Sequence, residues 1–187
     1  MSTPTQTAPT RAGSWMQTYS GGQFWPLDPR PDEVTATDIA HALSMQCRYN
    51  GMSRRFLSVA EHCVLMSLAV SPANALPALL HDATEAYVGD MIRPLKAHMP
   101  DYVAVEHQVA WAIGERFGIS PVLPGEVAEA DTRILLDERA AVMADSPLPW
   151  GMEHLAPLGV EIRCWSPQEA EHAYLARLAE LTTEAGR

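Results

Sequence analysis

The chain has 187 residues, of which 47% are hydrophobic and 19% charged, and these values favour one globular domain with a sizeable core. The formal net charge of −10 excludes a general nucleic-acid binder, because such affinity depends on Lys and Arg side chains that neutralise phosphates. A small anionic substrate is not excluded, since a few placed cations suffice to bind it.

The compartment is indicated by the cysteines and by the lack of membrane signals. Cys47, Cys63 and Cys164 have no paired spacing, which is typical of reduced thiols in a cytoplasmic protein. No apolar run reaches the roughly 18 residues needed to span a bilayer, so we expect no membrane partner. Residues 1–14 are rich in Ser, Thr, Ala and Pro and are predicted to form a disordered or late-ordering arm before a single domain at 15–187.

The domain is predicted to be all-α after a short N-terminal segment. Aromatic and Thr residues on both sides of Gly21-Gly22 indicate a small β-hairpin between Trp15 and Trp25, and three prolines then favour irregular structure. Apolar spacing and cap residues predict a bundle of about six helices: 38–49, 58 onward, a third that ends at Gly89, 101–117, 125–144 and 166 onward.

The third helix carries the stretch ALLHDATEAYVGD, which places ionisable groups on an apolar helix. A buried, unpaired carboxylate is costly, so His81 and Asp82 need a partner that a divalent cation would supply. His62 and Asp131, each on another apolar helix, are candidates for further ligands. Each residue alone is better explained as an ordinary core or surface side chain, and Glu129 or Asp137 can be confused with Asp131. Their joint occurrence in this order favours a metal site.

The other five histidines are better explained without a metal ion. His41 is better explained as a structural histidine of its helix, and four further histidines have no acidic or cysteine partner at a ligand spacing: His98, His107, His154 and His172. Trp150 and Trp165 are predicted to pack the last helix onto the bundle.

The segment from about Asp38 to Ala144 resembles the HD-domain metal-dependent phosphohydrolases. The extended motif HDATEAYVGD, with SVAEH around His62 and MIRPLK from Met91 to Lys96, is similar to one branch of them. That branch contains 5′-deoxynucleotidases and phage-type deoxynucleoside triphosphate hydrolases, notably dATP triphosphohydrolases.

The resemblance implies a role for each matching position. His62, His81, Asp82 and Asp131 would bind the metal, Glu85 would orient or deprotonate the attacking water, and Asp90 would contact the sugar hydroxyl. Arg48 and Lys96 would contact phosphate oxygens, while Tyr49 would stack on a base and Pro94 would line the base or sugar pocket.

The donor set suits Co²⁺, Mn²⁺, Zn²⁺, Fe²⁺ or Ni²⁺ better than Ca²⁺, with Mg²⁺ a further candidate on the substrate phosphates. The resemblance also implies a homo-oligomer and a location in the cytoplasm of a bacterium or of a phage-infected cell.

The substrate is expected to be a deoxynucleotide, and two versions of the reaction remain open. Cations near the motif favour a triphosphate, with dATP first, split into deoxynucleoside and triphosphate: Arg48, Arg54, Arg55, Arg93 and Lys96. The alternative is a 5′-deoxynucleotidase that acts on monophosphates. Another HD-type phosphodiesterase, an alarmone hydrolase and a non-catalytic nucleotide-binding protein rank below these two.

Overall fold

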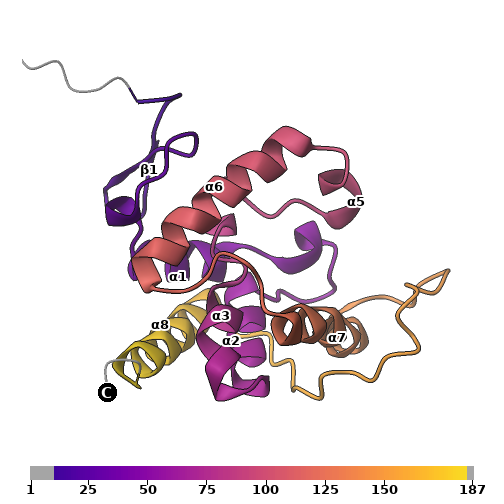
Figure 1. Ribbon diagram of the computed structural model, residues 1–187. Helices are drawn as coiled ribbons and strands as arrows, with labels where there is room; N and C mark the ends of the chain where they lie inside the picture. Colours follow the sequence, from indigo (N-terminus) through magenta and orange to yellow (C-terminus); the bar gives the residue numbers. More distant parts are fainter. Residues whose placement is uncertain (1–10, 185–187) are drawn as a thin grey trace, which may run out of the picture.

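In this computed structural model, residues 11–184 are described, and they form a helical bundle with a two-stranded sheet at one edge (Figure 1). The predicted all-α class is confirmed. The helices are α1 Ala36–Met45, α2 Val59–Ala69, α3 Ala75–Leu80, α4 Glu85–Val88, α5 Arg93–Lys96, α6 Pro100–Phe117, α7 Gly125–Val142 and α8 Pro167–Glu184. Three 3₁₀ turns, η1 Pro31–Glu33, η2 Arg48–Gly51 and η3 Pro72–Asn74, and the strands β1 Met16–Gln17 and β2 Gln23–Phe24 complete the elements. Among residues 11–184, no helix combines the length and apolar character needed to cross a bilayer.

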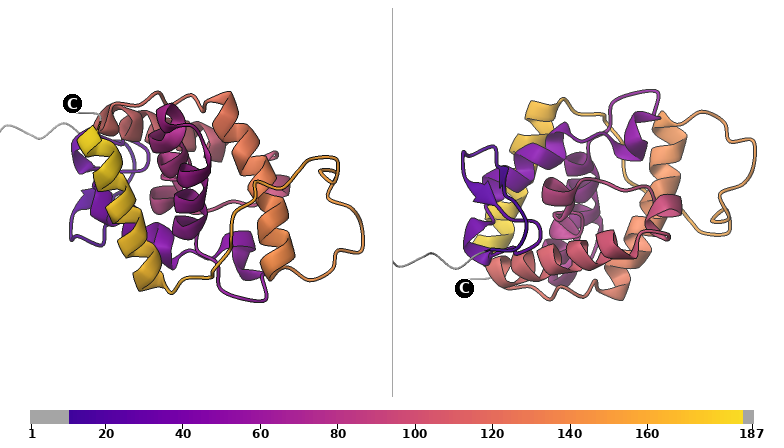
Figure 2. Two further views of the ribbon diagram at one scale, coloured as in Figure 1. Left: turned by 90° about the horizontal axis from the view of Figure 1, so that it is seen from below. Right: turned by 90° about the horizontal axis from the view of Figure 1, so that it is seen from above.

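Helix α2 lies at the centre of the bundle. It begins where the Ser58 hydroxyl accepts a hydrogen bond from the Glu61 N–H, which is the predicted cap. Every residue from 59 to 67 is buried, as expected of a helix that is apolar all round. Helices α1, α3, α7 and α8 pack around it, and the two views of Figure 2 show it enclosed by them. A polar side chain on α2 therefore lies inside the protein.

The hairpin between Trp15 and Trp25 is confirmed. Strands β1 and β2 are antiparallel, with Met16 opposite Phe24, and the fully buried Phe24 ring stacks on Tyr87 with centroids 3.9 Å apart. Of the predicted arm at 1–14, residues 1–10 lie outside the described part of the chain. The Arg11 guanidinium pairs with the carboxylates of Asp28, at 2.8 Å, and Glu33.

Asp38 ties this hairpin to α1. Its buried carboxylate accepts hydrogen bonds from the Ser20 N–H at 2.7 Å and from the Thr35 hydroxyl at 2.6 Å. Burial alone would raise the pKa of Asp38, but the Thr35 and Ser20 donors outweigh it and lower the pKa below its ordinary value. The ionised side chain is thus the one that the fold stabilises.

We expect Asp38→Asn to lower the free energy of unfolding by about 2 kcal/mol at pH 7, because two charge-assisted hydrogen bonds are weakened. The folded pKa is depressed, so this contribution is present above the unfolded pKa of about 3.9 and is lost as pH falls through the folded pKa. Urea denaturation at pH 7 and pH 3 measures the difference. The exposed Asp32→Asn is the control, expected within about 0.5 kcal/mol of the parent at both pH values. A gap for Asp38→Asn that does not shrink at low pH contradicts the assignment.

Two predicted helices differ from the observed ones. The first was predicted to reach Tyr49 but ends at Met45, and the chain continues into the separate turn η2, where Tyr49 and Asn50 have positive φ. The third was predicted as continuous to Gly89, but α3 ends at Leu80 and α4 begins at Glu85. Between them the backbone bonds run from residue i to i+3, for example Ala83 N–H to Leu80 O, so the helix is wound more tightly there.

The segment from 143 to 165 joins α7 to α8 without helix or strand. The fully buried Glu61 of α2 accepts hydrogen bonds from the backbone N–H groups of residues 163, 164 and 165, at 2.6–2.9 Å. Asp137 of α7 accepts in the same way from Leu158 and Gly159. These carboxylates satisfy backbone donors that a loop would otherwise leave unpaired. Trp165 packs against the core next to α8, as predicted for it.

Candidate metal centre

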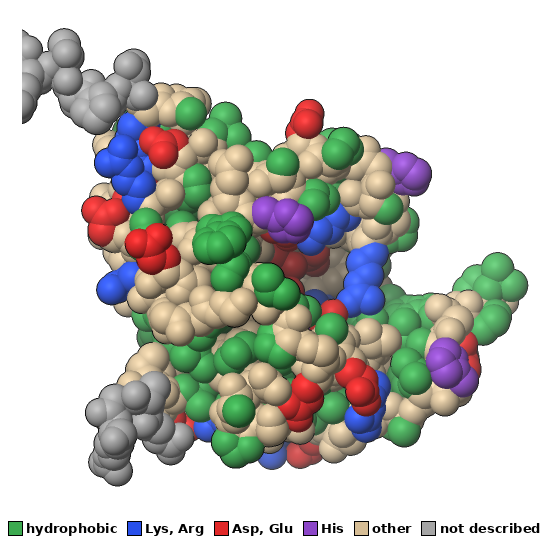
Figure 3. All heavy atoms as spheres, in the orientation of Figure 1, with side chains coloured by type: hydrophobic (Ala, Val, Ile, Leu, Met, Phe, Trp, Pro, Cys, Tyr) green, Lys and Arg blue, Asp and Glu red, His purple; other side chains and the backbone are tan. Residues whose placement is uncertain are grey.

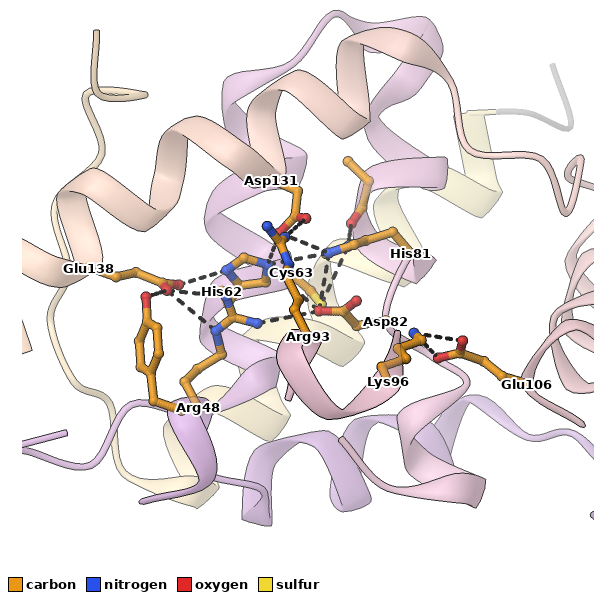
Figure 4. Close-up of polar contacts among 12 residues, drawn as sticks. Arg48, His62, Cys63, His81, Asp82, Arg93, Lys96, Glu106, Asp131 and Glu138 are labelled. Atoms are coloured by element: carbon orange, nitrogen blue, oxygen red, sulfur yellow. Dashed lines mark hydrogen bonds and ion pairs between the residues drawn. The ribbon is translucent and has the colours of Figure 1, made fainter. Parts of the chain in front are cut away.

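Four side chains from three parts of the chain converge beside α2 (Figure 4). His62 lies in the first turn of α2, His81 and Asp82 lie in the turn between α3 and α4, and Asp131 lies in α7. The Nε2 atoms of the two imidazoles are 3.3 Å apart. The Asp82 Oδ2 atom is 3.1 Å from the His81 Nε2 and 3.7 Å from the His62 Nε2. Asp131 Oδ1 is 3.5 Å from the His62 Nε2, so all four predicted ligands meet.

The ring nitrogens that face one another are the ones free to bind a cation. The Nδ1 of His81 lies 2.8 Å from the Ala78 carbonyl oxygen, which only accepts, so this nitrogen carries the hydrogen. The Nδ1 of His62 lies 2.6 Å from a carboxylate oxygen of Glu138 and donates to it. In the neutral rings both Nε2 atoms then present lone pairs to each other, and two facing acceptors need a positive charge between them.

The spacing of the donor atoms fits a metal ion. Ligand atoms about 2.1 Å from one ion, at angles of about 90–109°, lie roughly 3.0–3.4 Å apart. The measured separations of 3.1–3.9 Å are close to this range, and the ligand atoms of His62, His81 and Asp131 all lie within 4.8 Å of one another. His62, His81, Asp82 and Asp131 can therefore hold a divalent cation.

The electrostatics of the cluster also favour positive charge. Burial would lower the pKa of His81, but the adjacent Asp82 outweighs it and raises that pKa well above its ordinary value. Burial would likewise raise the pKa of Asp131, but the hydrogen bond with His62 and the nearby His81 hold it at about 2. Without a metal ion, these pKa shifts favour a protonated His81 beside ionised Asp82 and Asp131.

The residues that could be confused with Asp131 lie elsewhere. Glu129 is exposed and pairs with Arg133, and Asp137 binds the backbone of Leu158 and Gly159. His41 is structural, because its ring stacks on Tyr19 at a centroid distance of 3.5 Å. The ligand choice among the α7 carboxylates is therefore decided by geometry.

Glu85 lies one helical turn beyond Asp82, and both side chains line a cavity that opens beside the cluster. The Glu85 backbone carbonyl accepts a hydrogen bond from the Gln46 side-chain amide. Its Oε2 atom is buried and has no hydrogen-bond partner among the described residues. Burial, followed by the negative charges of Asp82 and Asp90, raises the pKa of Glu85 to about 9. This carboxyl group holds a proton at neutral pH unless positive charge is added nearby.

Arg48 is fixed next to the cluster by local backbone pairing. Cys47 and Ser58 form an isolated β-bridge, and the Arg48 N–H donates to the Leu57 carbonyl at 2.8 Å. Its guanidinium, only 10% exposed, lies 3.5 Å from Asp82 and 3.2 Å from Glu138. Burial opposes the charged form, but Glu138 and Asp82 raise the pKa of Arg48 above its ordinary value. The next residue, Tyr49, is in the left-handed region with φ 57°, a conformation uncommon outside glycine.

A cavity of about 730 Å³ opens beside the cluster, within the size range of small-molecule sites. Figure 3 shows the hollow between the α5–α6 region and α7, with acidic and basic side chains around it. Its walls contain every predicted site residue except the two histidines: Arg48, Tyr49, Asp82, Glu85, Asp90, Pro94, Lys96 and Asp131. Asp90 is exposed to solvent as a whole residue, but its carboxyl group at the cavity wall is partly desolvated, and this raises its pKa.

The cations counted near the motif divide into two groups. Arg93 reaches across the cavity to Asp131 at 2.5 Å, and Lys96 pairs with Glu106 at 2.6 Å, away from the cluster (Figure 4). Arg54 and Arg55 are absent from the described cavity lining, and the Arg55 guanidinium instead donates to the Arg163 carbonyl. Three of the five cations therefore face the cavity.

Two residues of this region were missed or misplaced by sequence reasoning. Glu138 has no exposed surface and contacts His62, Arg48 and the Tyr49 hydroxyl. It lies two turns after Asp131 on the same face of α7, and this spacing could have indicated from the sequence that it faces the site. Trp150 was predicted to pack the last helix, which is wrong. Its ring lines the cavity, with its centroid 6.1 Å from that of Tyr49. The 143–165 segment, which is hydrogen-bonded to Glu61 and Asp137, places it there.

Comparison with known proteins gives relatives over nearly the whole chain. No family model matches the sequence. The protein YfdR of Escherichia coli strain K12, described as uncharacterized, is 37% identical over 161 residues, which cover 86% of this chain and 90% of YfdR. An uncharacterized protein of Rhodobacter capsulatus is 34% identical over 183 residues, covering 88% of this chain and 93% of that protein.

Proposed function

The chain belongs to the same family as YfdR of Escherichia coli, and we propose that it is a metal-dependent hydrolase of deoxynucleotides. The observation that carries this proposal is the convergence of two imidazoles with two carboxylates that line one large cavity. The same cavity contains a buried arginine, Arg48, and an unpaired carboxyl group, Glu85. The resemblance of HDATEAYVGD to the HD-domain phosphohydrolases supports the same reaction class.

In the proposed reaction, a water oxygen forms a bond to phosphorus, and the bond between phosphorus and the 5′ oxygen breaks. A divalent cation held by His62, His81, Asp82 and Asp131 would polarise a phosphate oxygen, lower the pKa of a water molecule and favour ionised Glu85. Glu85 then takes the proton of the attacking water at its free Oε2 atom. The proton that Glu85 takes from the water is returned to the 5′ oxygen, which leaves as the deoxynucleoside hydroxyl.

Binding of the nucleotide is assigned to the rest of the cavity wall. Arg48 and Lys96 neutralise charge on the phosphates, and Arg93 can join them when it releases Asp131. Asp90 accepts a hydrogen bond from the sugar hydroxyl. Tyr49 stacks on the base, and Pro94 lines the base or sugar pocket.

The favoured substrate is a deoxynucleoside triphosphate, dATP first, which gives deoxynucleoside and triphosphate. This preference follows from the sequence resemblance and from the three cations in the cavity. One observation favours the alternative, a 5′-deoxynucleotidase. Arg54 and Arg55 are absent from the described cavity lining, and all three remaining cations already pair with carboxylates, which leaves less positive charge for a polyphosphate.

Product analysis by ion-exchange chromatography separates these reactions. Purified protein is incubated with each of the four deoxynucleoside triphosphates and monophosphates, with Co²⁺ or Mn²⁺ and with a chelator as the control. Deoxynucleoside plus intact triphosphate supports the triphosphohydrolase, and the base turned over fastest identifies the preferred substrate. Orthophosphate released from monophosphates alone supports the 5′-deoxynucleotidase. No metal-dependent turnover of any of the eight contradicts the proposed function.

A further inference from the structure

Glu138 of α7 is a fully buried carboxylate between the metal cluster and the arginine beside it. One oxygen, Oε1, accepts a hydrogen bond of 2.6 Å from the Nδ1 of His62. The other, Oε2, lies 3.2 Å from the Arg48 guanidinium and 2.5 Å from the Tyr49 hydroxyl (Figure 4). The two oxygens of one side chain thus contact a predicted metal ligand on one side and two predicted substrate contacts on the other.

We propose that Glu138 is a positioning residue that orients His62 for metal binding and Arg48 for phosphate binding. As the acceptor at Nδ1, it holds the His62 ring in the tautomer whose Nε2 lone pair points to His81 and Asp131. As the partner of Arg48, it keeps the guanidinium 3.5 Å from Asp82, at the cavity wall. The first role depends only on the metal site, and the second depends on the proposed function.

Full burial is the reason for expecting a large effect. A buried carboxylate must have its oxygens paired, and here the pairing atoms belong to His62, Arg48 and Tyr49. If His62 turned away, Oε1 would lose its partner, and if Arg48 turned away, Oε2 would keep only the neutral Tyr49 hydroxyl. Carboxylates that accept from the distal nitrogen of a metal-binding histidine contribute about 10–100-fold to metal affinity.

The same chain offers a matched comparison, Glu61. It is equally buried, it precedes His62 on α2, and among the described residues its carboxylate accepts hydrogen bonds only from the backbone of the 163–165 segment. Glu61→Gln and Glu138→Gln therefore make the same chemical change at the same depth. A loss of metal binding caused only by a loosened fold would appear in both variants.

The test is a calorimetric titration of the metal-free full-length protein with Co²⁺, with the visible absorption spectrum of the bound ion as a second readout. We expect Glu138→Gln to bind Co²⁺ about 10–100-fold more weakly and to change the spectrum, because His62 is no longer held. Glu61→Gln should stay within about threefold of the parent, with an unchanged spectrum. At saturating Co²⁺, Glu138→Gln should also bind inorganic phosphate several-fold more weakly, while Glu61→Gln should not.

The proposal is overturned if Glu138→Gln keeps the parental affinity and spectrum, or if Glu61→Gln loses both to the same extent. If Glu138→Gln does not fold by circular dichroism, Glu138→Asp, which is too short to reach all three partners, takes its place. Asp137→Asn is then the neighbouring control, because within residues 11–184 the Asp137 carboxylate accepts hydrogen bonds only from the 158–159 backbone. If the parent protein binds Co²⁺ but hydrolyses no deoxynucleotide, the proposed function is contradicted. The comparison of Glu138→Gln with Glu61→Gln still tests the metal-binding role of Glu138. A parent that binds no Co²⁺ overturns the metal site and this role together.

Discussion

The Asp82→Ala variant is expected to lose both cation binding and hydrolysis. The Asp82 carboxylate lies 3.1 Å from the His81 Nε2 and 3.7 Å from the His62 Nε2, so it supplies one ligand and much of the negative charge that favours a cation. Its removal also leaves Arg48 without its partner at 3.5 Å. We expect Co²⁺ affinity to fall by more than about 100-fold, since loss of a direct ligand should exceed loss of an outer partner.

The measurement is a Co²⁺ titration alongside the product assay, with thermal denaturation to show that the variant is folded. Asp137→Ala is the matched control, because it removes a carboxylate whose hydrogen bonds in the described part of the chain are all to the 158–159 backbone. It should keep the metal and the activity, with some loss of stability. Parental Co²⁺ affinity in Asp82→Ala would show that Asp82 is not a ligand, even if turnover were lost.

Variants of Glu85 are expected to separate metal binding from turnover. The carboxyl group is not among the atoms that converge on the candidate site, so Glu85→Ala and Glu85→Gln should bind Co²⁺ within about threefold of the parent. Turnover should fall by about 10² or more, because the proposed base for the attacking water is gone. Parallel titration and initial-rate measurements on the same preparations test this separation.

The pH profile provides a second test of Glu85. Burial and its acidic neighbours raise its pKa to about 9, so the carboxyl group is protonated at neutral pH in the metal-free protein. A general base must be ionised, and kcat/KM should therefore rise with pH until Glu85 has lost its proton. A bound cation should shift this limb to lower pH. Glu85→Gln should not show this rise of kcat/KM with pH. Parental turnover in Glu85→Ala or in Glu85→Gln would rule out this mechanism.

The local features of the chain were predictable from the sequence. Ser58 and Glu61 predicted the start of α2, and the capping box of Ser166 and Glu169 predicted the start of α8, where the two side chains bond as expected. Gly118 ends α6 in the left-handed conformation with φ 69°. These features depend on residues within about four positions of one another, so short-range spacing is enough to identify them.

The composition of the candidate metal site was also predictable, because ionisable side chains on apolar helices are costly unless they share a partner. His62, His81, Asp82 and Asp131 were each placed on segments expected to face inward, and they meet in the structure. The breaks in the first and third predicted helices were not predictable from apolar spacing. Both lie beside the cluster, where the chain turns more tightly or adopts positive φ at Tyr49.

Only the tertiary structure decided which residues surround the site and which groups each of them contacts. Glu138 contacts His62 and Arg48 across 76 and 90 positions of sequence, and Trp150 reaches the cavity through a loop tied down by Glu61 and Asp137. Arg54 and Arg55, close to Arg48 in sequence, are absent from the described cavity lining, and the Arg55 guanidinium donates to the Arg163 carbonyl. Helix spacing determines which face a side chain occupies, whereas the packing of α7 against α2 determines which faces meet. The sequence alone therefore identified the donors of the site, and the fold selected their partners.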